Sequence, residues 1–230
     1  MTSHQEIRPV LTRAELEAHW MPYTANRQFK DDPRLVMAAE GVHLIDDRGR
    51  HVLDGLSGLW CTGAGHNRRE ITEAVHKQMQ TLDYAPAFQF GHPGSFHLAN
   101  RIVSLMPEGL EYVFFTNSGS ECADTSLKMA RAYWRQKGQP TKTILIGRSR
   151  GYHGVNFGGI SVGGIGANRK LFGQAVDADH LAHTLIPENA FTRGMPQHGW
   201  HLADELTELI ALHDASNIAA VIVEPMAGST

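Results

Sequence analysis

Residues 112–122 of this chain, Tyr112-Val113-Phe114-Phe115-Thr116 followed by Asn117-Ser118-Gly119-Ser120-Glu121-Cys122, decide the fold. The apolar run predicts a strand, and the polar turn after it predicts the start of a helix. Gly119 lets the backbone approach an anion closely, and the first turn of a helix offers unpaired N–H groups at its positive end. Ser118 and Glu121 also have capping-box spacing, so an ordinary capped helix is the alternative. We expect a phosphate cradle at Ser118, Gly119 and Ser120.

The segments that follow indicate an α/β fold with a mostly parallel sheet. An amphipathic pattern predicts a helix over residues 121–137, and the apolar run 143–146 predicts a strand, which together with 112–116 makes a βαβ unit. A helix over 202–213 leads into another apolar strand, 218–223, which we expect to be fully buried. Ligands of parallel sheets bind beyond the carboxyl ends of the strands.

Segments on both sides of this unit complete the organisation. Residues 35–54 alternate short apolar runs with polar turns and predict a β-meander. Helical spacing predicts core-facing helices over 69–82 and 93–106. The glycine-rich region 155–197 is expected to form short helices that cover the site. We therefore divide the chain into an N-terminal segment with the meander, residues 1–65, and the first part of a larger α/β domain, residues 66–230.

Four candidate residues stand near glycines or at a strand end. Tyr152 and His153 lie between Gly151 and Gly154, so Tyr152 can lie flat against a planar heterocycle, or it can simply close a hydrophobic lid. Glu224 ends an apolar strand, where a carboxylate is costly to bury without a partner, although it can also be a plain cap. Trp60 lies in a glycine-flanked turn and either lines a pocket or fills the core.

Composition excludes several classes of function. With a net charge of −3, 42% hydrophobic and 20% charged residues, the chain resembles an ordinary globular protein, and its scattered basic residues do not predict nucleic-acid binding. Cys61 and Cys122 are too few for a disulfide scaffold, which favours the cytoplasm. The N-terminus, Met1–Glu6, lacks the pattern of an export signal, and no apolar stretch is long enough to span a membrane. The paired histidines lack carboxylate or cysteine partners, so no metal site is expected.

Taken together, six motifs resemble the class III aminotransferases. They span nearly the whole chain: Trp20-Met21-Pro22-Tyr23-Thr24, Leu56-Ser57-Gly58-Leu59-Trp60, Ala64-Gly65-His66, Phe115-Thr116-Asn117-Ser118-Gly119-Ser120-Glu121, Gly151-Tyr152-His153-Gly154 and Val223-Glu224-Pro225. Segment 20–27, Trp60 and segment 84–92 are most similar to the subgroup that uses β-alanine or other omega-amino acids with pyruvate. Members that act on ornithine, 4-aminobutyrate or aromatic amines are the alternative.

The resemblance implies a fold-type I architecture and pyridoxal 5′-phosphate as the cofactor. It also implies a homodimer with interfacial sites, and transfer of an amino group from an amine donor to a keto acid acceptor. It assigns roles to the candidates: Ser118, Gly119 and Ser120 hold the phosphate, Tyr152 stacks on the ring with His153 beside it, and Glu224 organises the polar network. Tyr23, Trp60 and Phe88 line the substrate pocket.

The resemblance also implies that this chain is the N-terminal half of such an enzyme. In the family the Schiff-base lysine and the carboxylate beside the ring nitrogen follow later, beyond Thr230, so no catalytic residue is expected among these 230 and the chain alone is expected to be inactive. A naturally short, non-catalytic relative that binds the cofactor is the alternative. A sheet that ends with strand 218–223 is expected to leave an aggregation-prone apolar edge.

Overall fold

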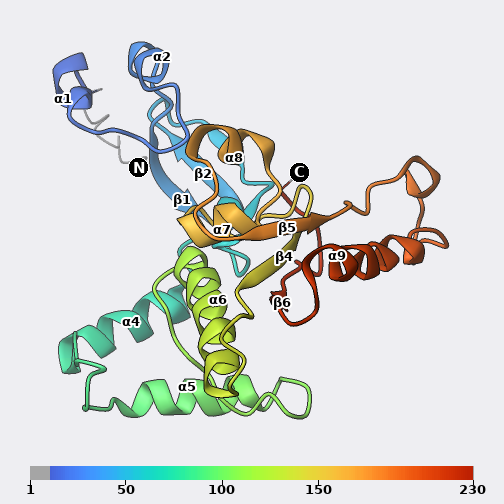
Figure 1. Ribbon diagram of the computed structural model, residues 1–230. Helices are drawn as coiled ribbons and strands as arrows, with labels where there is room; N and C mark the ends of the chain where they lie inside the picture. Colours follow the sequence, from blue (N-terminus) through green and yellow to red (C-terminus); the bar gives the residue numbers. More distant parts are fainter. Residues whose placement is uncertain (1–10, 230) are drawn as a thin grey trace, which may run out of the picture. The chain divides into compact units, whose positions relative to one another are not determined.

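A computed structural model describes residues 11–229, so the expectation for Met1–Glu6 lies outside the described residues. The chain divides into two compact units, Met1–Asn100 and Arg101–Thr230, and helix α5 crosses the boundary between them. Figure 1 labels most of the elements. The domain boundary between residues 65 and 66 stays a prediction.

The first unit contains the expected β-meander. Strands β1 (Val36–Glu40), β2 (His43–Asp46) and β3 (His51–Leu53) pair antiparallel in the order β1-β2-β3. The turn between β2 and β3 is fixed by the Asp46 carboxylate, which accepts hydrogen bonds from the N–H groups of Arg48 (3.0 Å) and Arg50 (2.8 Å). The other elements of this part of the chain are α1 (Arg13–Glu17), α2 (Asn26–Asp31), α3 (Ser57–Trp60), α4 (Arg69–Thr81) and α5 (Pro93–Val103).

Helices α4 and α5 form where they were predicted, but they are not core-facing. The apolar stripe of α4, which includes Ile71, Val75 and Met79, is at least half exposed, and Leu98 of α5 is equally exposed. Amphipathic periodicity shows which side chains share a face of a helix, but not which element covers that face. The expectation of core-facing helices is therefore wrong for the described chain.

The second unit is built on a parallel sheet, as expected. Its three strands lie in the order β5-β4-β6: β4 (Ile144–Arg148) pairs in parallel with β5 (Ala178–Leu181) and with β6 (Ile218–Val221). The other elements are α6 (Gly119–Gln136), α7 (Phe157–Val162), α8 (Gly166–Phe172), η1 (Pro187–Asn189), η2 (Trp200–Asp204) and α9 (Glu205–His213).

A small core joins α6 and α7 to the sheet. Leu127 of α6, only 6% exposed, packs with Leu145, Val162 and Ala219. The Trp134 indole N–H donates to the carbonyl of Ala219 (2.6 Å), which ties α6 to β6. This core fixes the N-terminal end of α6 relative to the carboxyl ends of β4 and β6.

Three details of this unit differ from the sequence expectations. Segment 112–116 is not a strand, because in the part of the chain that the structure describes no backbone group pairs with it; the first strand of the expected βαβ unit is therefore missing. Strand β5 lies inside the region expected to form short helices; the sequence did not predict this strand, because its four residues carry no apolar alternation. Strand β6 ends at Val221, and the exposure of Val221 and Val223 shows that the 218–223 segment is an edge and not fully buried.

Candidate functional site

The N-terminus of α6 presents unpaired N–H groups, as a phosphate cradle requires. Ser118 is the N-cap, and its hydroxyl accepts a hydrogen bond from the N–H of Glu121 (3.1 Å). The Glu121 carboxylate does not complete the capping box but accepts from the Asn117 backbone N–H instead (2.9 Å). Within residues 11–229, the N–H groups of Gly119 and Ser120 have no protein acceptor. Two donors therefore remain available at the positive end of the longest helix of this unit.

The loop after β4 crosses this helix end. The hydroxyl of Ser120 accepts a hydrogen bond from the Val155 N–H (3.0 Å). Gly154, with φ +91°, approaches so closely that a Cβ at this position would lie 2.6 Å from the Cα of Ser120. The glycine is needed for both its positive φ and this contact. The loop is thereby held against the two free N–H groups.

Asp124 anchors the far side of the same loop. Its carboxylate accepts from the N–H of Gly159 (2.9 Å) and so binds the first turn of α7 to α6. Sequence reasoning missed Asp124, although a carboxylate next to the buried stripe of α6 was a signal that it pairs with a neighbouring segment. Gly147 has a similar role: a Cβ there would meet the carbonyl oxygen of Val162 at 1.9 Å, so only glycine lets α7 pack on β4.

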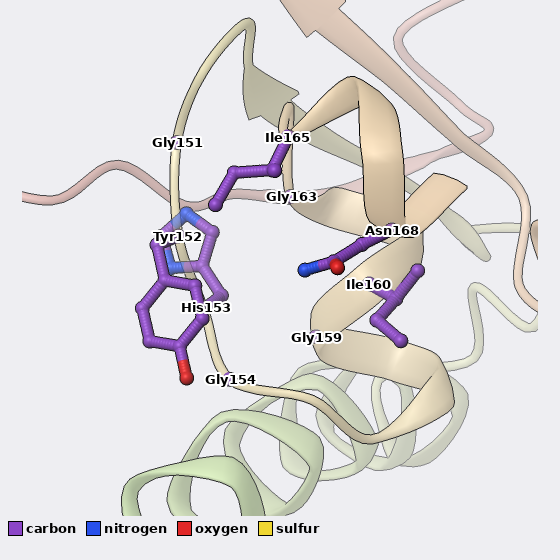
Figure 2. A pocket seen from close by; sticks show the side chains of 9 residues that line it. All are labelled: Gly151, Tyr152, His153, Gly154, Gly159, Ile160, Gly163, Ile165 and Asn168. Carbon is purple, nitrogen blue, oxygen red and sulfur yellow. The ribbon is translucent and has the colours of Figure 1, made fainter. Parts of the chain in front are cut away.

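A small cavity of about 10 Å³ lies under this loop. In Figure 2, Tyr152 and His153 lie on the loop side of the cavity, and Asn168 points toward them from α8. The volume suits a single water molecule. This cavity is too small for a larger ligand, whereas Tyr152 is 41% exposed and accessible from outside the loop.

Glu224 and His153 form a half-buried polar cluster with Arg148. The Arg148 guanidinium donates to the backbone carbonyl of Glu224 (3.1 Å) and lies 3.9 Å from its carboxylate, so the carboxyl ends of β4 and β6 are linked. The Glu224 side chain is only 16% exposed. Glu224 Oε1 and His153 Nε2 are buried without a hydrogen-bond partner among the described residues. Sequence reasoning did not assign a role to Arg148, although a charged residue ending a buried strand was a signal.

The electrostatics keep His153 neutral. Burial is the main cause that lowers the pKa of His153, and the positive charge of Arg148 lowers it further, whereas the Glu224 carboxylate acts in the opposite direction. A neutral imidazole can both donate and accept a hydrogen bond. The cluster thus offers a carboxylate and a neutral imidazole beside the aromatic ring of Tyr152.

A larger cleft of about 340 Å³ lies along the side of α6. Lys128 is among its lining residues, but Ser118, Gly119 and Ser120 are not. Lys128 therefore lies along the side of the helix, in a cleft that Asn117 and Glu121 also line. In residues 11–229 no three His, Cys, Asp or Glu side chains gather as metal ligands do.

The sequence-predicted residues thus fall into two groups. Ser118, Gly119, Ser120, Tyr152, His153 and Glu224 all belong to the second unit, where the contacts above connect their segments. Tyr23, Trp60 and Phe88 belong to the first unit, where all three are largely exposed. Their part in a substrate pocket stays a prediction. The described residues contain no helix long and apolar enough to cross a bilayer.

Sequence comparison connects these residues with one enzyme family. The family Aminotransferase class-III matches residues 24–230. The chain is 67% identical over 222 residues to the beta-alanine–pyruvate aminotransferase of Pseudomonas aeruginosa, covering 96% of this chain and 50% of that protein. It is 66% identical over 220 residues to the omega-amino acid–pyruvate aminotransferase of Pseudomonas putida, covering 95% and 49%. The chain spans about half the length of these curated relatives.

Solved structures agree with the sequence comparison. An (S)-enantioselective omega-transaminase from Thermomicrobium roseum matches with a TM-score of 0.86 and 33% identity over 96% of this chain and 51% of that one. An amine transaminase from an uncultivated Pseudomonas species, in its PLP-bound form, matches with a TM-score of 0.82 and 33% identity over 93% and 50%. The expected fold-type I α/β architecture is confirmed. The chain belongs to the class III aminotransferase family.

Proposed function

We propose that this protein moves an amino group from an omega-amino acid or amine of the β-alanine type to pyruvate, with pyridoxal 5′-phosphate as its cofactor. The names of the two Pseudomonas relatives described above support the donor and the acceptor. Because the chain spans half of their length, the activity is proposed for the whole protein. By the same analogy we propose a cytoplasmic homodimer.

One observation carries the proposal: the second unit joins two free helix N–H groups, an exposed tyrosine ring and a polar cluster at one sheet edge. These features fit a flat, phosphate-bearing heterocycle. When bound, pyridoxal 5′-phosphate supplies an electron sink for reactions at the amino-bearing carbon. The N–H groups of Gly119 and Ser120, with Ser118 at the cap, would bind the phosphate.

The remaining residues of the site would orient the ring. Tyr152 would stack on one ring face. Glu224 and His153, whose buried Oε1 and Nε2 atoms have no hydrogen-bond partner within residues 11–229, would hydrogen-bond polar groups beside the ring. Tyr23, Trp60 and Phe88 would line the donor pocket. Proton transfer at the donor carbon is not assigned to any of these residues.

Cofactor binding tests the first half of the proposal on the 230-residue chain itself. Equilibrium dialysis should show that the chain retains pyridoxal 5′-phosphate more strongly than pyridoxal, which lacks the phosphate. Ser120→Ala, which removes the acceptor of the Val155 N–H, should reduce this preference. Ser126→Ala is the matched control, because its hydroxyl donates to the Ala123 carbonyl further along the same helix. Equal retention of the two compounds would refute the cradle.

Amino transfer tests the second half. A protein of the relatives' full length that carries this chain should form alanine from pyruvate with β-alanine as donor. Ornithine, 4-aminobutyrate and an aromatic amine should be poorer donors under the same conditions. A clear preference for one of these three would replace the β-alanine assignment and leave the cofactor result unaffected.

A further inference from the structure

Element α3 is a left-handed turn. Its four residues have positive φ angles: 49° at Ser57, 60° at Gly58, 57° at Leu59 and 71° at Trp60. Residues with side chains visit this region rarely and as single residues, because Cβ crowds the following carbonyl oxygen. A run in which three of four residues carry side chains persists only where surrounding groups hold it.

The Asp54 carboxylate holds the start of this turn. Asp54 directly follows β3, and its Oδ1 accepts a hydrogen bond from the N–H of Leu56 (3.3 Å). Its Oδ2 lies 2.7 Å from Nε2 of His66. The hydrogen bond from His66 is the main cause that lowers the pKa of Asp54, and the Gly58 N–H lowers it further. The carboxylate is therefore ionised at neutral pH and binds both the turn and the imidazole.

His66 is itself fixed to the β-meander. Its N–H donates to the carbonyl of Gly41 (2.7 Å), and its carbonyl accepts from the Gly41 N–H (3.1 Å). The Asp54 N–H donates to the carbonyl of Val42 (2.9 Å). Both partners of the Asp54–His66 pair are thus attached to the sheet β1–β3. The pair closes the loop between residues 54 and 66, and its side chains are only 8% and 16% exposed.

Trp60 depends on this closed loop for its direction. Its N–H donates to the Leu56 carbonyl (2.9 Å), and the Thr62 N–H donates to the Ser57 carbonyl (2.9 Å), so backbone hydrogen bonds close the turn on both sides of the tryptophan. The indole itself is 69% exposed and is not held by packing. A turn of the opposite hand would point the ring elsewhere.

We propose that Asp54 and His66 are positioning residues, whose hydrogen bond keeps α3 left-handed and thereby sets the direction in which Trp60 meets the substrate. The inference rests on the proposed function, in which Trp60 lines the donor pocket. It explains why a strained turn occurs at this place: the turn sets the direction of a ring that is 69% exposed.

Fluorine NMR of the 230-residue chain labelled with 5-fluorotryptophan tests the proposal. The chain has four tryptophans, and Trp60→Phe assigns the Trp60 signal. Asp54→Ala and His66→Ala should shift the Trp60 signal or broaden it beyond detection. His66→Gln should keep it in place, because the glutamine amide reaches the position of Nε2 and can donate to Asp54.

A second histidine–aspartate pair provides the matched control. His213 Nε2 lies 2.8 Å from Asp179 Oδ2 in the second unit, so His213→Ala breaks the same kind of contact away from α3. This variant should leave the Trp60 signal unmoved. An unmoved signal in Asp54→Ala and His66→Ala would overturn the proposal. A matching shift of the Trp20 signal would also overturn it, because the pair would then support the whole first unit. A Trp60 signal that moves in His66→Gln would overturn it as well.

The same labelled chain separates this inference from the proposed function. Addition of β-alanine with pyridoxal 5′-phosphate to the unsubstituted chain should move the Trp60 signal if Trp60 lines the donor pocket. The substitutions at Asp54 and His66 are read without any ligand. If the ligands have no effect, the pocket role of Trp60 fails, while the result on the turn remains.

Discussion

Replacement of Gly154 by alanine should separate the loop 151–156 from the N-terminus of α6. Gly154 has φ +91°, and the new Cβ would lie 2.6 Å from the Cα and Oγ of Ser120. An ordinary contact begins at 3.4 Å, so the loop must move by 3.4 − 2.6 = 0.8 Å. The positive φ costs about 1–2 kcal/mol, and forcing an extra methyl group into a packed contact costs about 1–3 kcal/mol.

The expected loss of unfolding free energy is therefore about 2–5 kcal/mol, a large part of the stability of a typical domain. The same movement should stretch the hydrogen bond from Val155 to Ser120, now 3.0 Å, and weaken retention of pyridoxal 5′-phosphate. Urea unfolding of the 230-residue chain measures the first effect, and equilibrium dialysis measures the second.

Two other glycines separate the backbone cost of a positive φ from the cost of the close contact with Ser120. Gly109 has φ +92° but no atom within 4 Å of its Cβ position, so Gly109→Ala measures the backbone cost alone. Gly166 begins α8 with neither a positive φ nor a near atom, so Gly166→Ala should be neutral or slightly stabilising. If Gly154→Ala costs no more than Gly109→Ala, the close contact with Ser120 does not hold the loop, and the reasoning is refuted.

Three more predictions concern the core, the charge state and the stacking ring. Leu127→Ala should lower the urea-derived unfolding free energy by about 2–5 kcal/mol, because it leaves a cavity, whereas the exposed Met129→Ala on the same helix should change it by less than about 0.5 kcal/mol. Because burial lowers the pKa of His153 and of His180 in the folded chain, stability should decrease as the pH falls below about 6.5, and NMR titration should give both imidazoles a lower pKa than that of a free histidine. An unshifted titration would contradict their burial. Tyr152→Ala should weaken retention of pyridoxal 5′-phosphate by about 2- to 10-fold with little change in unfolding, and unchanged retention would remove Tyr152 from the site.

The sequence predicted the parts of the fold that depend on local patterns. Helix α6 and strands β1 to β4 form at the expected positions because periodicity and turn residues report directly on them. Segment 112–116 has an equally strong strand pattern, yet it is not a strand, because a strand also needs a partner and periodicity carries no information about one. The expectation that α4 and α5 face the core failed for the same reason, because periodicity does not show which element covers an apolar face.

The geometry at the sheet edge was predictable from topology, whereas its supporting contacts were not. The rule that ligand sites lie at the carboxyl ends of parallel strands brought Tyr152 and Glu224 to one edge, where Arg148 links the strands. The contact of Gly154 with Ser120 and the anchor at Asp124 join residues more than thirty positions apart. No local signal reports on such a contact. The left-handed turn at residues 57–60 could not be predicted from the sequence either, because only Gly58 is a residue that favours positive φ.

The two orphaned polar atoms at the sheet edge argue for a ligand from energetics alone. Leaving a buried donor or acceptor unpaired costs about 1–3 kcal/mol, and native proteins keep few such groups. Glu224 Oε1 and His153 Nε2 lack partners in residues 11–229, although Arg148 already binds the Glu224 carbonyl and lies within 4 Å of its carboxylate. Arg148 thus holds the carboxylate in place without satisfying Oε1. Oε1 needs a hydrogen-bond donor, and the polar edge of a ring stacked on Tyr152 can supply one.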